Sequence, residues 1–153
     1  MITVRVDDPG GPHVAGLLGR HFATSTGNTP EGFAFVLGPE ALSGPGVTFF
    51  TAWDGDALAG MGALKDLDIG HAEVKSMRTG PGHLRKGVGA TVLARIVEAA
   101  RANGLRRLSL ETGTSDDYAA ARALYHRAGF VDCPAFADYP PDSPHNLYMT
   151  LEL

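Results

Sequence analysis

The sequence predicts an α/β protein in which a mixed β-sheet is flanked by helices. One observation is the Asp-Gly-Asp segment at residues 54–56, which joins two short apolar runs in the manner of a β-hairpin. A second is the strand pattern of residues 72–79, which leads through a glycine-rich turn into an amphipathic helix. A third is the succession of strand and helix patterns over residues 107–153, without an internal repeat.

The first part of the chain predicts a strand, a helix and a loop. Residues 3–7 alternate as a strand, and the prolines and glycines of residues 9–12 end it. Apolar side chains then recur at helical spacing, at Val14, Leu17, Leu18 and Phe22. Prolines and glycines weaken the pattern over residues 27–46, which therefore predict a loop with room for one short helix.

Three strands and a helix are expected next. Residues 47–53 and 57–64 form the two strands of the hairpin. Residues 72–79 alternate as a third strand, with one face made of Glu73, Lys75 and Met77 and the other of Val74, Ser76 and Arg78. After a break at residues 80–82, apolar residues recur at helical spacing over residues 88–100, and Asn103-Gly104 ends this helix.

The last part of the chain predicts a strand, a helix and two further strands. Residues 107–112 form the first strand, and Asp116 or Asp117 can cap the N-terminus of the helix that follows. The apolar stripe of this helix, closed by Gly129, consists of Tyr118, Ala121, Leu124, Tyr125 and Ala128. Residues 130–133 and 147–153 form the last strands, separated by a proline-rich loop.

Size and composition predict one domain that spans residues 1–153. The formal net charge of -4 argues against a nucleic-acid partner, which needs a strongly basic surface. No apolar stretch approaches the length of a membrane span and the start is strand-like, so we expect a cytoplasmic protein without a membrane partner. Cys133, the single cysteine, is expected to be a small buried side chain and not a catalytic thiol. The histidines lack the spacing of metal ligands, so we expect no metal.

The turn over residues 85–90 has the features of a phosphate-binding site. The first backbone amides of a helix lack partners within the helix, and the helix dipole makes that end positive. Gly87 and Gly89 leave room for an anion to approach these amides, and Arg85 and Lys86 add positive charge beside them. A tight turn selected for packing is the alternative. A Walker loop or a Rossmann fingerprint fits less well, because the Lys-Ser/Thr ending and the third glycine are missing.

Two motifs resemble the GCN5-related N-acetyltransferase (GNAT) family. Residues 72–79 and 83–89, a strand and a turn, resemble its coenzyme A motif, Arg/Gln-x-x-Gly-x-Gly/Ala. Residues 121–130 resemble its second signature, Ala-x-x-Leu-Tyr-x-x-x-Gly-Phe, and the two motifs occur in the family's order. The departures are Leu84, where the first motif position is usually Arg or Gln, and Tyr118, where an Asn is common.

This resemblance implies the GNAT fold, a mixed and mostly antiparallel sheet of six or seven strands flanked by about four helices. It also implies an acyl-CoA-dependent N-acyltransferase with acetyl-CoA as cosubstrate. The backbone of Met77, Arg78 and Thr79 would hold the pantetheine arm as an added strand, and Tyr118 would lie among the coenzyme contacts. The pyrophosphate would bind at Arg85, Lys86, Gly87, Val88, Gly89 and Ala90.

The resemblance further implies two catalytic side chains. Glu73 corresponds to the general base of several relatives, and Tyr125 to the tyrosine that donates a proton or a hydrogen bond to the coenzyme sulfur. A phenol stays protonated near neutral pH, which suits this task. As alternatives, Glu73 is a solvated strand residue or a partner of Lys75, and Tyr125 is part of the apolar stripe of its helix.

The expected reaction transfers an acetyl group from acetyl-CoA to a primary amine, on a small molecule or a peptide, by direct attack in a ternary complex. The alternative is a non-catalytic domain of the same fold that binds or senses acyl-CoA. Loops on a rigid scaffold commonly set specificity. The acceptor site is therefore expected among residues 27–46, Trp53, Glu111, Asp138, Tyr139, Asp142, His145 and Asn146. The resemblance also allows a homodimer, in which residues 147–153 pair across a sheet edge.

Overall fold

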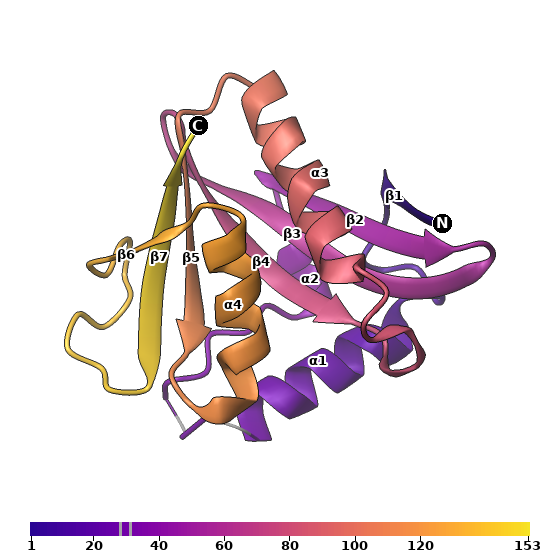
Figure 1. The fold of residues 1–153 in the computed structure, drawn as a ribbon, viewed down its shortest axis with the longest axis horizontal. Coiled ribbons are helices and arrows are strands. Elements are labelled where there is room, and N and C mark those ends of the chain that lie inside the picture. The colour runs from indigo at the N-terminus through magenta and orange to yellow at the C-terminus, as the bar shows by residue number, and fades with distance from the viewer. Residues whose placement is uncertain (28, 31) are drawn as a thin grey trace.

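The computed structural model describes residues 1–27, 29–30 and 32–153. Its centre is a seven-stranded sheet with the order β1-β2-β3-β4-β5-β7-β6 (Figure 1). Neighbouring strands are antiparallel except for β4 and β5, which run parallel. The strands are β1 (Ile2–Val6), β2 (Val47–Asp54), β3 (Ala57–Asp68), β4 (His71–Thr79), β5 (Arg107–Gly113), β6 (Val131–Cys133) and β7 (Asn146–Glu152).

Within the described residues, four α-helices cover the two faces of this sheet. α1 and α2 bury the smaller of two apolar clusters, and α3 and α4 bury the larger one. Figure 1 shows α3 and α4 on the face toward the viewer. The mixed, mostly antiparallel sheet with helices on both faces confirms the expected fold class. The helices are α1 (Ala15–Gly27), α2 (Pro39–Leu42), α3 (Val88–Ala102) and α4 (Ala119–Arg127), with 3₁₀ turns η1 (Pro81–His83) and η2 (Asp116–Tyr118).

The first hairpin and the first helix form where their patterns predict them. Asp54 pairs with Ala57 across the hairpin, and Gly55 has a φ of 61°, a conformation that glycine adopts without steric cost. β3 continues to Asp68, beyond the expected residue 64. In α1, Leu17 and Leu18 are buried, whereas Phe22, which shares their helical spacing, is 51% exposed.

Two predictions about the second half of the chain are also wrong. Neither Asp116 nor Asp117 caps α4, because both belong to the 3₁₀ turn η2 that precedes it. β7 is not at a sheet edge, because it lies between β5 and β6 and pairs with both. Residues 148–150 are covered by β6, so β7 lacks the free edge that the expected pairing across a dimer requires.

A β-bulge in β4 changes which side chains share a face of the sheet. The pairing of β3 and β4 shifts around Ser76, so that one residue of β3 faces two of β4, and Ser76 has a φ of 59°. The additional residue turns Met77 toward the α3 cluster and Arg78 toward α1, where it contacts His21. The simple alternation expected for residues 72–79 is therefore wrong beyond Lys75.

β4 and β5 separate soon after they begin to pair. Among the described residues, the ladder joins only residues 71–73 to residues 107–109, although β4 continues to Thr79 and β5 to Gly113. The two strand ends are visibly apart in Figure 1. Backbone groups along this edge of β4 lack a strand partner, so a ligand in the gap can pair with them.

Gly62 provides the room that the bulge needs. A Cβ atom at Gly62 would lie 2.7 Å from Met77 Sδ and 2.7 Å from Val92 Cγ1 of α3. We expect Gly62→Ala to lower the free energy of unfolding by about 1 to 3 kcal/mol, the usual cost of overpacking a core. Urea denaturation measures the change, with Gly19→Ala as control because no atom lies within 4 Å of a Cβ there. An unchanged unfolding midpoint for Gly62→Ala would contradict this packing.

Candidate active site

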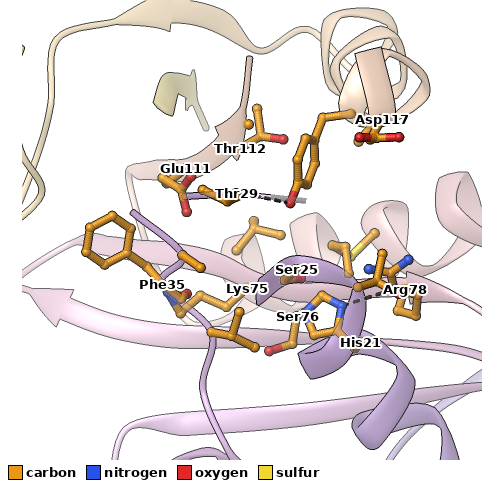
Figure 2. Close-up of a pocket in the computed structure, with 18 of the residues that line it drawn as sticks. His21, Ser25, Thr29, Phe35, Lys75, Ser76, Arg78, Glu111, Thr112 and Asp117 are labelled. Carbon is orange, nitrogen blue, oxygen red and sulfur yellow. Dashed lines mark hydrogen bonds between the residues drawn. The ribbon is translucent and has the colours of Figure 1, made fainter. Parts of the chain in front are cut away.

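A cavity lies at the gap between β4 and β5 and is lined by residues from α1, from the segment after it, from both strands and from α4. Figure 2 shows how side chains from these elements converge on it. Five residues that the sequence predicts for the site line this cavity, namely Glu73, Met77, Arg78, Tyr118 and Tyr125. Thr79 and residues 85–90 are not part of its wall and lie farther along the chain, at the end of β4 and the start of α3.

The turn before α3 presents unpaired backbone donors. In the described part of the chain, none of the amides of residues 85–90 donates a backbone hydrogen bond. Arg85 and Gly87 have positive φ angles of 63° and 76°, and Gly87 is the N-cap of α3 without a side-chain cap. Free amides at the start of a long helix attract an anion. The geometry of the turn therefore fits a pyrophosphate.

The two glycines of this turn have different roles. Gly87 needs its positive φ, and no atom lies within 4 Å of a Cβ placed there. At Gly89, by contrast, a Cβ would lie 3.1 Å from Leu124 Cδ2. The packing alternative considered for the turn therefore applies to Gly89, which lets α3 approach α4 closely.

The two basic residues of the turn also differ. Lys86 Nζ lies 3.1 Å from Asp54 Oδ2 and 3.3 Å from His83 Nδ1. This hydrogen bond and the lysine charge hold the pKa of Asp54 below its usual value. Arg85 forms no ion pair within the described residues, so it is the cation of the turn that is available to a ligand.

Glu73 is buried and accepts two hydrogen bonds on one oxygen. Lys75 Nζ lies 3.2 Å from Glu73 Oε2, and the Tyr139 hydroxyl donates to the same atom. Lys75 Nζ also donates to Tyr139 Oη at 2.7 Å and to the Phe35 carbonyl at 3.4 Å. Burial and the Glu73 charge raise the pKa of Tyr139, so its phenol stays protonated. The alternative that pairs Glu73 with Lys75 is confirmed, and the solvated alternative is wrong.

Glu111 is a second carboxylate of the cavity. Burial raises its pKa, although the hydrogen bond from Asn146 Nδ2 at 2.9 Å opposes this shift. Asn146 Nδ2 also donates to the Phe33 carbonyl at 3.0 Å, which fixes the amide in place. Of the single residues proposed for the acceptor site, Glu111, Tyr139 and Asn146 thus line the cavity or contact its carboxylates. The proposed segment 27–46 contributes Thr29, Phe33, Ala34, Phe35 and Val36 to the wall.

Other candidates from the sequence lie away from the cavity. Trp53 donates from Nε1 to Thr51 Oγ1 at 2.8 Å and stacks on His13, outside the cavity wall. Asp138, Asp142 and His145 do not line it either. Cys133 is half-buried in β6, and burial raises the pKa of its thiol, which makes it a poor nucleophile.

Two tyrosines from η2 and α4 line the cavity. Tyr125 is buried, and burial together with the Glu111 charge raises its pKa, so its hydroxyl stays protonated. The Tyr118 ring lies against Gly113, where a Cβ would be 2.2 Å from the ring, and its hydroxyl is 3.1 Å from Thr29 Oγ1. Only a glycine at the end of β5 admits this ring. Gly113 was not singled out from the sequence, because glycine is required there by a contact with Tyr118, which belongs to a later turn.

His21 is a cavity residue that the sequence did not single out. Arg78 Nε donates to His21 Nδ1 at 3.1 Å, as the dashed line in Figure 2 marks. Burial and the positive charges of Arg78 and Lys75 lower the pKa of His21 to about 4. The ring is therefore neutral at pH 7. A histidine in a helix, separated from Arg78 by 57 positions, gives no local pattern from which this pair could be found.

Known proteins resemble this chain in fold and in sequence. The model of the Acetyltransferase (GNAT) family matches residues 21–130. YsnE of Bacillus subtilis (strain 168), an uncharacterized N-acetyltransferase, is 47% identical over 150 residues, which cover 98% of this chain and 99% of that protein. YedL of Escherichia coli (strain K12), also an uncharacterized N-acetyltransferase, is 43% identical over 153 residues, covering 100% of this chain and 96% of YedL. The solved structure of a candidate acyl-CoA N-acyltransferase from Klebsiella pneumoniae matches with a TM-score of 0.81 and 27% identity, over 100% of this chain and 98% of that one.

The chain belongs to the GNAT family. It is an acetyltransferase, and its cosubstrate is acetyl-CoA. The unpaired amides of residues 85–90 and the open edge of β4 are the groups of this GNAT chain that fit the coenzyme. Among the described residues, no three or more His, Cys, Asp or Glu side chains gather in a way that could hold a metal ion. In the same part of the chain, no helix is long and apolar enough to cross a membrane.

The low pKa of His21 predicts a pH-dependent loss of stability. Since the folded pKa of about 4 lies below the ordinary 6.5, the unfolded chain binds this proton more tightly. Stability is therefore lost as the pH falls through this window, by at most about 3 kcal/mol and by less where solvent reaches the ring. We expect His21→Gln, whose amide oxygen can accept the Arg78 hydrogen bond, to lose less stability between pH 6.5 and pH 4 than the wild type.

Urea denaturation across this pH range measures the difference. His126→Gln serves as the control, because His126 lies on the surface, where it bonds to Asp132. Parallel pH profiles for His21→Gln and the wild type would show that His21 is not buried as a neutral ring.

Proposed function

We propose that this GNAT acetyltransferase transfers an acetyl group from acetyl-CoA to a primary amine by direct attack within a ternary complex. The observation that carries the proposal is the cavity in the gap between β4 and β5, which is lined by Tyr125 and by two carboxylates, Glu73 and Glu111. Such a cavity can bring a thioester and an amine together with a proton acceptor at hand. Two relatives named as N-acetyltransferases support nitrogen as the acceptor atom.

The coenzyme would be held mainly by backbone groups. The amides of residues 85–90 would donate to the pyrophosphate, and the open edge of β4 at residues 77–79 would pair with the pantetheine amides. Leu84, which is 63% exposed, replaces the Arg or Gln that is usual at this motif position, and the adjacent Arg85 would supply the positive charge. Recognition by the backbone tolerates this replacement, because a backbone amide donates a hydrogen bond regardless of which side chain the residue carries.

The amine must lose a proton as it attacks, and Glu111 is our assignment for the base. Burial raises the pKa of Glu111, which brings it closer to the working range of a base at neutral pH. Glu73, which the family motif favours, would have to give up its ion pair with Lys75 and its hydrogen bond from Tyr139 to take this proton. In this assignment Glu73 positions Lys75 and Tyr139. The competing hypothesis is that Glu73 itself is the base.

Tyr125 would act on the departing sulfur. Negative charge develops there as the bond from carbon to nitrogen forms and the bond from carbon to sulfur breaks. Because burial and the Glu111 charge raise the pKa of Tyr125, its phenol is a weak acid at neutral pH. We therefore propose that Tyr125 stabilises the thiolate by donating a hydrogen bond, without giving up its proton.

Coenzyme binding should depend on the turn before α3. We expect Gly87→Val to lose the thermal shift that acetyl-CoA causes in the wild type, because a β-branched residue does not adopt a φ of 76° unless the turn moves. Arg85→Ala should weaken binding about tenfold and reduce its salt dependence. Lys86→Ala should have a smaller effect, since Asp54 already pairs with this lysine.

Gly82→Val is the control for the turn. Gly82 is a nearby glycine without a positive φ, and no atom lies within 4 Å of a Cβ placed there. If Gly87→Val binds acetyl-CoA like the wild type, the pyrophosphate does not bind at these amides.

The proton path should be visible in pH–rate profiles of thiol release with a panel of amines. Glu111→Gln should lower kcat/KM by about 10² to 10⁴, with partial recovery at high pH, where the amine is already neutral. Tyr125→Phe should lower kcat without such recovery and leave the affinity for acetyl-CoA nearly unchanged. If the activity of Glu73→Gln recovers at high pH and that of Glu111→Gln does not, Glu73 is the base. Absence of thiol release with every amine would favour a non-catalytic acyl-CoA-binding domain.

A further inference from the structure

A half-buried guanidinium faces the cavity, and no described residue supplies it with an anionic partner. Arg78 uses its Nε to donate to His21 Nδ1, and in the described part of the chain it forms no ion pair. A guanidinium has five N–H donors, so the two Nη groups remain for a ligand. Burial lowers the pKa of Arg78, which means that its charge lacks part of its hydration. An anion bound in the cavity would stabilise the guanidinium charge in place of the missing water.

One more unused donor lies on the same cavity wall, and a second polar group lies buried behind it. Because His21 is neutral at pH 7 and accepts on Nδ1, its proton sits on Nε2, which donates to no described residue. Ser76 Oγ is buried, with the residue 9% exposed, and has no hydrogen-bond partner in the described part of the chain. The hydroxyl is enclosed by the protein itself, so its missing partner belongs to the bulge and is not a contact for a ligand in the cavity. The bulge that turns Arg78 toward α1 also contains Ser76.

The other charges of the cavity divide it into a cationic and an anionic part. Lys75 is neutralised by Glu73 at 3.2 Å, so the pair adds little net charge. Among the described residues, Arg78 is then the cation of the cavity wall without a counterion, while Glu111 lies on β5 across the gap from it. Asp117, a residue of η2, also lines the cavity. A ligand that carries both charges would complement this arrangement better than a simple amine.

We propose that the acceptor is a primary amine that carries a carboxylate, of the free amino acid class. Its carboxylate binds to the Nη groups of Arg78, with His21 Nε2 as a further donor, and its amine faces Glu111. Arg–carboxylate pairs are often bidentate, which fixes the orientation of the ligand as well as its affinity. Phe33 and Phe35 add apolar wall, so amino acids with apolar side chains fit best. The inference rests on the proposed amine acetyltransferase function.

The test compares matched acceptors in steady-state kinetics. L-leucine, L-phenylalanine and L-methionine are each assayed beside the corresponding amide and the decarboxylated amine. In the wild type, kcat/KM for at least one amino acid should exceed that of its two analogues by about tenfold or more. Arg78→Met should lower kcat/KM for the amino acid by about 10- to 100-fold more than for the two analogues, so that the preference for the amino acid is lost. Arg78→Lys should recover part of the loss, because it retains the charge but not the bidentate geometry.

The KM for acetyl-CoA separates the acceptor role from a coenzyme role. It should change less than about twofold in Arg78→Met, because the coenzyme would use the backbone of this residue and not its side chain. A large rise in that KM, or an equal loss with all three classes of acceptor, would overturn the inference. Circular dichroism of Arg78→Met and Arg78→Lys checks that both variants fold.

A binding measurement distinguishes failure of this inference from failure of the proposed function. If no amine is turned over, the proposed function fails, but the carboxylate site can still be probed by calorimetry in the presence of coenzyme A. N-acetyl-L-leucine, N-acetyl-L-phenylalanine and N-acetyl-L-methionine should then bind to the wild type, and their amides should bind at least about tenfold more weakly. Arg78→Met should remove this preference. Equal binding of acids and amides, or binding of neither, would overturn the inference.

Discussion

The β-bulge at Ser76 is the constraint on which the rest of the site depends. One additional residue in β4 places Met77 in the core under α3 and turns Arg78 to the α1 side. β4 and β5 stop pairing at Glu73 and the bulge is at Ser76, so one short segment of β4 contains both the opening of the gap and the change in side-chain direction. In a regular strand Arg78 would point into the apolar cluster under α3, where its charge would have neither solvent nor a partner.

The buried charges then connect segments that are distant in sequence. Glu73 and Lys75 have side chains that are only 3% and 8% exposed, so removing either one would leave a buried charge without compensation. Lys75 also bonds to the Phe35 carbonyl and to the Tyr139 hydroxyl, and it thereby attaches two loops to the middle of β4. Because the pair is neutral as a whole, it would orient a charged ligand less than Arg78 and Glu111 would.

The features that the sequence predicts correctly are those with a local cause. The hairpin at Gly55 and the end of α3 at Gly104 require positive φ angles, which glycine supplies and which are visible in the sequence. The bulge is different, because neither Ser76 nor its neighbours break the strand pattern, and the reason for it lies in β3 at Gly62. The contacts that define the cavity are also non-local, since Glu73 meets Tyr139 across 66 positions. Periodicity and turn chemistry carry no information about such pairs.

The geometry of a strand explains why the family was easier to predict than the acceptor. Backbone N–H and C=O groups of β4 lie in the plane of the sheet, whereas its side chains point to the two faces. A coenzyme arm in the gap would therefore use groups that every residue has, and the motifs would need only to shape the backbone, as Gly87 does. An acceptor that reaches the gap from the α1 side instead meets the particular side chains of His21, Arg78 and Glu111. Two of these three lie outside the family motifs, so the motifs identify the chemistry and leave the acceptor to residues that only the fold brings together.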